Sequence, residues 1–180
     1  MSSHLPTQQP VPNTYYAVAG ISAFITRMRA DDKEAVVSGI WVDILRHIFP
    51  SATLYQIRPE QFSRRGPADL CVLQLVTRNN QRHEYQFLVV QCKKPSGESQ
   101  DAVWAGAKDQ IKDYLAGLKP LNIPRRVYGI VAVGRWAQFV EYNRGTKSLD
   151  ALNGERDKLH IERQCLTIQG LLEYIEANHQ

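Results

Sequence analysis

The feature that most constrains the fold is the run VYGIVAVG at residues 127–134, which is almost continuously apolar. A strand of this composition buries side chains on both faces, which is typical of a central strand in a sheet that is covered on both sides. Further strand and helix signals flank this run along the chain. We therefore expect an α/β fold with a mixed central β-sheet flanked by helices.

The periodicity of apolar residues places the other elements. Helices are predicted at residues 15–29, 32–49, 99–118 and 167–178. Strands are predicted at residues 53–58, 68–76, 84–93, 136–143 and 158–164. The polar segment TRNNQR, with Asn79 and Asn80 at its centre, favours a hairpin between two of these strands. Residues 144–156 are typical of a loop.

The length of 180 residues and the mass of 20.5 kDa suit one domain, predicted over residues 14–180 after a flexible tail at 1–13. Hydrophobic residues make up 43% and charged residues 22%, which excludes a disordered chain. No apolar run approaches the roughly 20 residues of a membrane span, so we expect no membrane partner. The net charge of +4 permits a polyanionic partner without requiring one.

The N-terminal segment is polar and contains prolines, with no apolar core of the kind found in a signal peptide. Cys71, Cys92 and Cys165 are widely spaced and form no zinc-binding motif, so we expect buried thiols. These features favour an intracellular protein, nuclear or cytoplasmic.

Polar residues gather where two predicted neighbouring strands meet an edge of the sheet. Gly66 and Pro67 predict a break between two strands. Asp69 opens one strand just after them, and Gln91 and Lys93 close the next strand. Because side chains alternate along a strand, Gln91 and Lys93 share a face. Charged groups at such a position form either a structural ion pair or a functional site.

These residues resemble the PD-(D/E)XK, or restriction-endonuclease-like, nuclease superfamily. Its pattern is an Asp after a Pro, then an acidic residue and a Lys on the next strand, here Pro67-Ala68-Asp69 and Gln91-Cys92-Lys93. The helix that follows carries the Gln-x-x-x-Tyr of the RecB-type branch, as Gln110 and Tyr114. The resemblance spans about residues 30–145, and the sequence of this region is similar to that of a fungal group of nuclease-like domains. It implies a restriction-endonuclease-like core (αβββαβ).

The resemblance also implies Mg²⁺-dependent (or Mn²⁺-dependent) hydrolysis of nucleic-acid phosphodiesters, with DNA favoured over RNA. Asp69 would be the principal metal ligand, with Gln91 and Glu34 beside it, because Mg²⁺ prefers oxygen ligands. Lys93 would face the attacking water and the phosphate. Gln110 and Tyr114 would hold substrate or brace Lys93. The basic residues Arg64, Arg65 and Lys94 would hold substrate as well.

The sequence departs from the family pattern at Gln91, where the family has its second acid. Several alternatives follow: the missing carboxylate comes from Glu34 or Asp43, or from Glu98 or Asp101, or the site is inactive. An inactive nuclease fold would serve as a nucleic-acid-binding or protein-interaction module, with a protein partner or a second copy of the chain as its ligand.

Overall fold

The computed structural model describes residues 12–118, 126–154 and 157–179, so most of the predicted tail at 1–13 lies outside the described residues. The α-helices are α1 (Ala19–Arg27), α2 (Glu34–Ile48), α3 (Asp101–Gly117) and α4 (Cys165–Asn178). The strands are β1 (Tyr55–Ser63), β2 (Gly66–Arg78), β3 (Gln81–Lys93), β4 (Val127–Val133), β5 (Trp136–Asn143), β6 (Ser148–Ala151) and β7 (Leu159–His160).

The strands form one mixed sheet in the order β1-β2-β3-β4-β5-β6, with β7 paired to β5. β3 and β4 are parallel, and every other pair of neighbours is antiparallel. All seven residues of β4 are buried, which confirms the prediction for this segment. The chain is therefore of the α/β class, with a mixed sheet flanked by helices.

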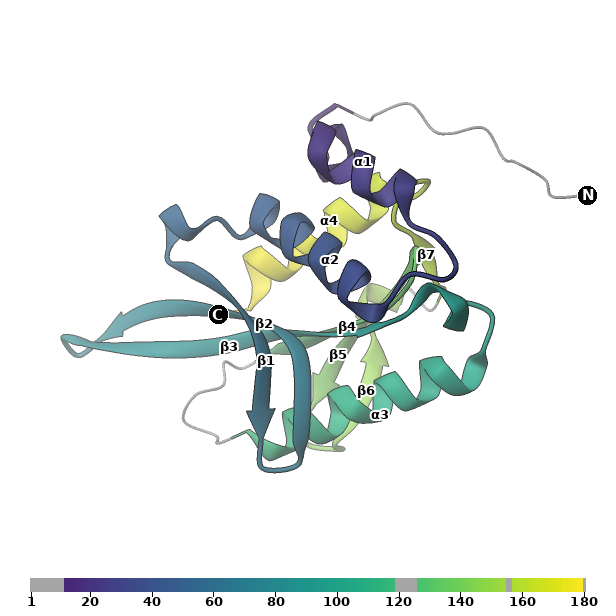
Figure 1. Ribbon diagram of the computed structural model, residues 1–180. Helices are drawn as coiled ribbons and strands as arrows, with labels where there is room; N and C mark the ends of the chain where they lie inside the picture. Colours follow the sequence, from purple (N-terminus) through teal and green to yellow (C-terminus); the bar gives the residue numbers. More distant parts are fainter. Residues whose placement is uncertain (1–11, 119–125, 155–156, 180) are drawn as a thin grey trace, which may run out of the picture.

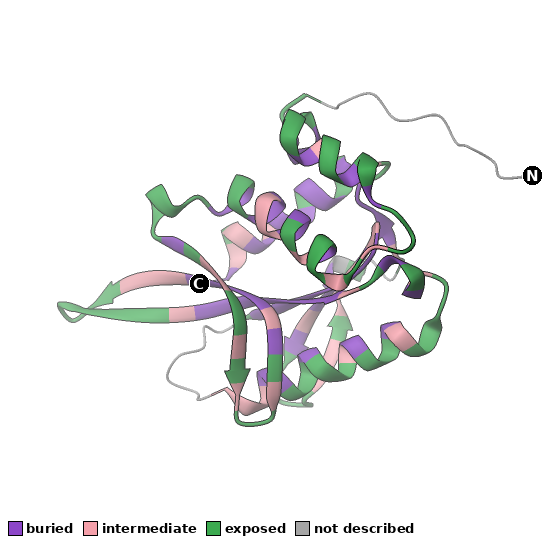
Figure 2. Ribbon diagram, viewed as in Figure 1, coloured by how far each residue is buried: buried purple, intermediate pink, exposed green. Residues whose placement is uncertain are grey.

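Helices cover both faces of the sheet (Figure 1). α1, α2 and α4 lie on one face, where Trp41 packs edge-on against Phe139 of β5. α3 lies alone on the other face, where Ile111, Tyr114 and other buried residues meet the sheet. Figure 2 shows the resulting buried layers on both sides of the central strands. Among the described helices, none has the length and apolar character that a membrane span requires.

Two hairpins build the first half of the sheet. Asn79 and Asn80 have φ angles of 51° and 59°, so the predicted turn between β2 and β3 is confirmed. The segment around Gly66, predicted as a break, is instead the turn of a second hairpin, in which Ser63 pairs with Gly66. β1 consequently runs to Ser63, beyond the predicted strand at 53–58, because the ladder with β2 stabilises residues of weak strand propensity.

The last third of the chain also differs from the prediction. The segment 144–156, predicted as a loop, contains β6, which pairs with the edge of β5 through Leu149 and Tyr142. The predicted strand at 158–164 is reduced to the two residues of β7. The predicted helix at 15–29 is divided at Val18, whose extended backbone separates a short 3-10 turn from α1.

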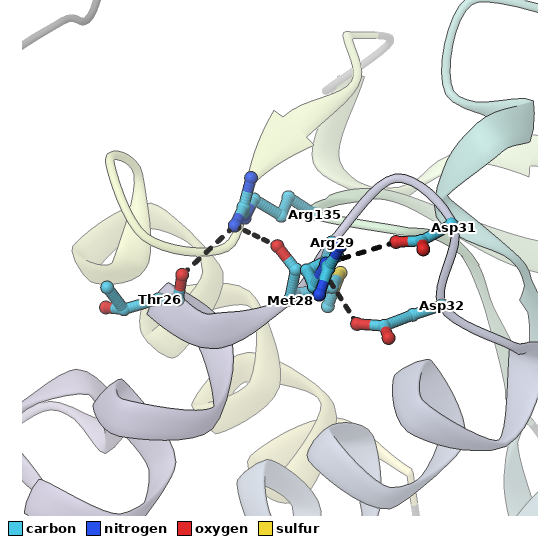
Figure 3. A network of polar contacts seen from close by, with 6 residues as sticks. All are labelled: Thr26, Met28, Arg29, Asp31, Asp32 and Arg135. Atoms are coloured by element: carbon cyan, nitrogen blue, oxygen red, sulfur yellow. Dashed lines mark hydrogen bonds and ion pairs between the residues drawn. The ribbon is translucent and has the colours of Figure 1, made fainter.

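Arg135, in the turn between β4 and β5, joins three parts of the fold. Its guanidinium donates to the carbonyl oxygens of Thr26 and Met28 at the end of α1 (Figure 3). Its backbone N–H donates to Glu98 at 2.8 Å. Arg29, next to this end, pairs with Asp31 at 3.2 Å. These contacts fix the segment that leads into α2.

His160 of β7 is buried with its ring edge-on to Trp136. Its Nδ1 accepts the backbone N–H groups of Glu162 at 3.2 Å and Arg163 at 3.4 Å, so this nitrogen must be unprotonated. Burial, followed by the positive charges of Arg163 and Arg135, lowers the pKa of His160 to about 4.

Stability should therefore decrease as the pH falls from about 6.5, the ordinary pKa of a histidine, to about 4. Within this window the unfolded chain binds a proton at His160 that the folded chain does not, so acid favours unfolding. Thermal unfolding at a series of pH values should show this slope in wild type and in the exposed-site control His47→Gln. His160→Gln should have a shallower slope, and an unchanged slope would contradict the assignment.

Gly129 lies where β4 closely approaches its neighbours. An added Cβ would lie 2.8 Å from Cγ2 of Ile111 in α3 and 2.9 Å from Cγ2 of Val140 in β5. We expect Gly129→Ala to lower the free energy of unfolding by about 1–3 kcal/mol through overpacking, measured by denaturant titration. Gly106→Ala is the control, because nothing lies within 4 Å of its added Cβ. Equal stability of the two variants would contradict close packing at Gly129.

Candidate functional site

The candidate site lies where β2 separates from β3. The ladder between these strands ends at the pair Leu70 and Val90, and Asp69 is the next residue beyond it. One oxygen of Asp69, Oδ2, accepts the Nε2–H of Gln91 and the backbone N–H of Cys92, both at 2.6 Å. The predicted adjacency of Asp69 and Gln91 on neighbouring strands is confirmed.

Gln91 is buried, with 2% of its surface exposed. Because a carboxylate only accepts hydrogen bonds, Asp69 fixes the amide of Gln91 with Nε2 toward it and Oε1 away from it. Within the described part of the chain, this Oε1 has no hydrogen-bond partner. A buried carbonyl oxygen without a partner costs about 1–3 kcal/mol, so this oxygen is an energetic penalty within the fold.

Lys93, the last residue of β3, forms an ion pair with Glu34, the first residue of α2, at 3.6 Å between Nζ and Oε2. Their side chains are 22% and 45% exposed. The ion pair of Lys93 is therefore made with Glu34 and not with Asp69. The beginning of α2 and the end of β3 lie side by side (Figure 1), which is how an acid from a helix reaches the end of a strand.

Cys92 lies between Gln91 and Lys93 in sequence and is fully buried on the opposite face. Burial raises the pKa of its thiol well above the usual value, and the negative charges of Asp69 and Glu34 raise it further, while Lys93 lowers it. The three charges thus act on one buried atom. We name Glu34, Asp69, Gln91, Cys92 and Lys93 the Asp69 cluster. The sequence predicted Cys92 only as a buried thiol, although its place between Gln91 and Lys93 indicates that it lies next to the site.

The other acids considered as replacements for the missing carboxylate are engaged elsewhere. Asp43 pairs with Arg46 at 3.9 Å on the same helix. Glu98 accepts the backbone N–H of Arg135, and Asp101 pairs with Lys158 at 3.2 Å. Glu34 is therefore the acid that the fold brings to Lys93.

Gln110 and Tyr114, the residues of the Gln-x-x-x-Tyr motif, lie in the second half of α3. Tyr114 is buried, and its hydroxyl accepts the Nε2–H of Gln86 at 2.5 Å and the thiol of Cys71 at 3.4 Å. Its partners are thus these two residues and not Lys93, which it was expected to brace. Gln110, one turn earlier, is exposed. Tyr114 therefore faces the sheet and Gln110 faces solvent, because only one side of α3 packs against the sheet.

The basic residues predicted to hold substrate are all exposed. Arg64 and Arg65 form the turn of the β1–β2 hairpin, and Lys94 directly follows β3. Arg64 and Arg65 lie by the C-terminal end of α3, where Gly117 approaches the hairpin turn. Lys94 lies before the N-terminal end of the same helix, so the structure does not gather the three basic residues at one place.

The Asp69 cluster carries two carboxylates and one ammonium, and so one net negative charge. Asp69 and Gln91 offer oxygen atoms of the kind that hard cations prefer. Among the described residues, no three side chains of the His, Cys, Asp or Glu type gather closely enough to hold a metal ion. The cluster therefore offers the type of ligand atom that a divalent cation prefers, but its net negative charge is small.

Replacing the amide of Gln91 by a carboxylate should destabilise the fold. Gln91→Glu would place a second negative oxygen beside Oδ2 of Asp69, where the donor now lies at 2.6 Å. We expect a loss of roughly 1–3 kcal/mol at neutral pH, because a buried donor is lost and like charges meet. The loss should shrink at acidic pH, where the two carboxylates share a proton.

Thermal unfolding of the variants measures this effect. The matched control is Asp69→Asn with Gln91→Glu, which exchanges the amide and the carboxylate and so keeps one donor and one acceptor. This double variant should recover part of the lost stability. A Gln91→Glu protein as stable as wild type at neutral pH would show that the contact with Asp69 does not form in solution.

No protein-family model, curated protein or solved structure matches the chain. The resemblance of its motifs to the PD-(D/E)XK superfamily thus stays a prediction, and the function has to be inferred from the geometry of the Asp69 cluster.

Proposed function

We propose that the chain is a restriction-endonuclease-like domain that hydrolyses phosphodiester bonds of nucleic acid, DNA in preference to RNA, with Mg²⁺ or Mn²⁺ as its cofactor. The order of elements supports this: α2, three antiparallel strands β1 to β3, the crossover helix α3 and the parallel strand β4 follow the αβββαβ pattern. The observation that carries the proposal is the gathering of Asp69, Gln91, Lys93 and Glu34 at the end of β3.

The oxygen donors of the cluster fit a divalent cation. Oδ2 of Asp69 is engaged by two N–H groups, which leaves its second carboxylate oxygen for a metal. The unpartnered Oε1 of Gln91 supplies a neutral oxygen, and Glu34 a further carboxylate. A bound metal would polarise the phosphate and lower the pKa of its water. With an amide in place of one acid, we expect weak metal affinity.

The residues of the chain have separate roles in this proposal. Lys93 orients the attacking water and stabilises the negative charge that develops on the phosphate. Glu34 positions Lys93 through their ion pair. Gln91 holds Asp69 in a fixed orientation, and Arg64, Arg65 and Lys94 attract the phosphate backbone.

A second candidate function uses the same fold without catalysis. Asp69 already accepts two hydrogen bonds and Lys93 already has an ion-pair partner, so the cluster is nearly satisfied without a ligand. This arrangement favours an inactive nucleic-acid-binding or protein-interaction module, with a partner protein or a second copy of the chain bound to it.

Cleavage of plasmid and single-stranded DNA with Mg²⁺ or Mn²⁺ tests the proposal. Wild type should cleave, and Asp69→Ala and Lys93→Ala should each reduce the rate by at least about 100-fold, because the metal ligand or the cation beside the water is lost. The controls Asp109→Ala and Lys112→Ala remove exposed charges from the outer side of α3 and should keep the wild-type rate.

Metal binding is measured separately by thermal unfolding. A nuclease should gain stability with increasing Mg²⁺ or Mn²⁺, by about 2.7 kcal/mol at 100 times the dissociation constant. The gain should disappear in Asp69→Ala. Absence of both cleavage and metal-dependent stabilisation would reject the enzyme and favour the inactive module. Cleavage that survives both Asp69→Ala and Lys93→Ala would place the activity outside the Asp69 cluster.

A further inference from the structure

The tip of the β1–β2 hairpin presents an aromatic side chain to solvent. Phe62 is 77% exposed, more than any other large apolar side chain in the described part of the chain. The hairpin extends from the sheet to the C-terminal end of α3 (Figure 1), and exposed residues are mixed with intermediate ones at its tip (Figure 2). An aromatic ring held this openly on a rigid element is available for stacking by a ligand.

Two arginines follow Phe62 at the turn. Arg64 and Arg65 are exposed, and neither belongs to an ion pair within the described residues. The side chain of Ser63 holds the backbone of the turn at residues 63–66. Its hydroxyl donates to the carbonyl of Gly66 and accepts the N–H of Arg65, both at 3.2 Å. The tip therefore combines a fixed backbone with two unneutralised cations beside an open ring.

The tip is close to the Asp69 cluster along the strand. Phe62 pairs with Pro67, which precedes Asp69 by two residues on β2, a separation of about 7 Å along a strand. Glu60 lies between the register partners of Leu70 and Ala68 and has a φ of 45°, an uncommon conformation for a residue other than glycine. A ligand held at the tip would thus pass beside Asp69.

α3 supports the tip from the other side. A Cβ added to Gly117, the last residue of α3, would lie 2.5 Å from Oγ of Ser63 and 2.9 Å from the backbone nitrogen of Arg65. Such contact is possible only because Gly117 has no side chain. The position of the tip therefore depends on Gly117, although this residue is not itself offered to a ligand.

We propose that the hairpin tip is a binding arm for single-stranded nucleic acid, in which Phe62 stacks on a base and Arg64 and Arg65 contact the flanking phosphates. This inference rests on the proposed function and specifies how its substrate is held. A single strand is favoured because its unpaired bases expose their faces to one ring, while its phosphates match the two arginines. A stable protein interface would require a wider apolar surface than this tip offers. Phe62 is a single apolar side chain between two polar residues, Gln61 and Ser63.

Fluorescence anisotropy with a labelled oligothymidylate of about 20 nucleotides tests the proposal. The measurement is made in EDTA, so that no metal-dependent cleavage occurs. Phe62→Ala should weaken binding about tenfold through loss of stacking, and Phe62→Trp should restore it. Phe24→Ala, which removes an exposed aromatic ring from α1, is the matched control and should bind like wild type.

The arginines and Gly117 give two independent readouts. Arg64→Ala with Arg65→Ala should weaken binding and reduce the slope of log affinity against log salt by about 1.4, because two phosphate contacts are lost. Gly117→Ala should weaken binding by displacing the tip without removing a contacting side chain, whereas Gly106→Ala should not.

The outcome separates this inference from the proposed catalysis. Binding that depends on Phe62 in a chain that never cleaves would support the arm and reject the nuclease. Cleavage in a chain whose binding is unaffected by Phe62→Ala would support the nuclease and overturn the arm. The arm is also overturned if duplex binds as tightly as single strand and with no dependence on Phe62, or if wild type binds no nucleic acid.

Discussion

The parallel pairing of β3 with β4 is the constraint on which the rest of the structure depends. Parallel strands cannot be joined by a tight turn, so the chain must cross a face of the sheet, and α3 makes that crossing. The crossing buries one face of β4, and the layer of α2 and α4 covers the other, which explains why β4 is apolar throughout. It also leaves the end of β3 open, at the place where β2 turns away.

Local signals predicted the central elements of the fold. The apolar run of β4 and the Asn79–Asn80 turn are encoded in consecutive residues, and both formed as expected. β6 and the outer half of β1 were missed because their hydrogen bonds come from strands that are already in place. The contact of Arg135 with the end of α1 joins residues more than 100 positions apart, and no local pattern reveals such a pair.

For the candidate site, the sequence predicted which residues lie at the strand ends and on which face, but not which contacts they form. Alternation and chain order predicted that Asp69 lies near Gln91 and Lys93, and the structure shows the contact between Asp69 and Gln91. They did not reveal that Lys93 turns to Glu34, since that depends on how α2 begins beside β3. Spacing alone also misled for Tyr114, because residues one turn apart share a side of a helix without sharing its burial.

Gln91 is the residue at which the two candidate functions diverge. A carboxylate there would face Asp69 across a very short distance and would need a cation between or beside the two acids. The amide removes that need, because its Nε2–H donates a hydrogen bond to Asp69 and brings no second negative charge. The cluster therefore holds together without a metal. The amide also leaves Oε1 buried and unpartnered, a cost that packing has not removed. The same substitution therefore weakens the requirement for a metal while keeping an oxygen in place to bind one.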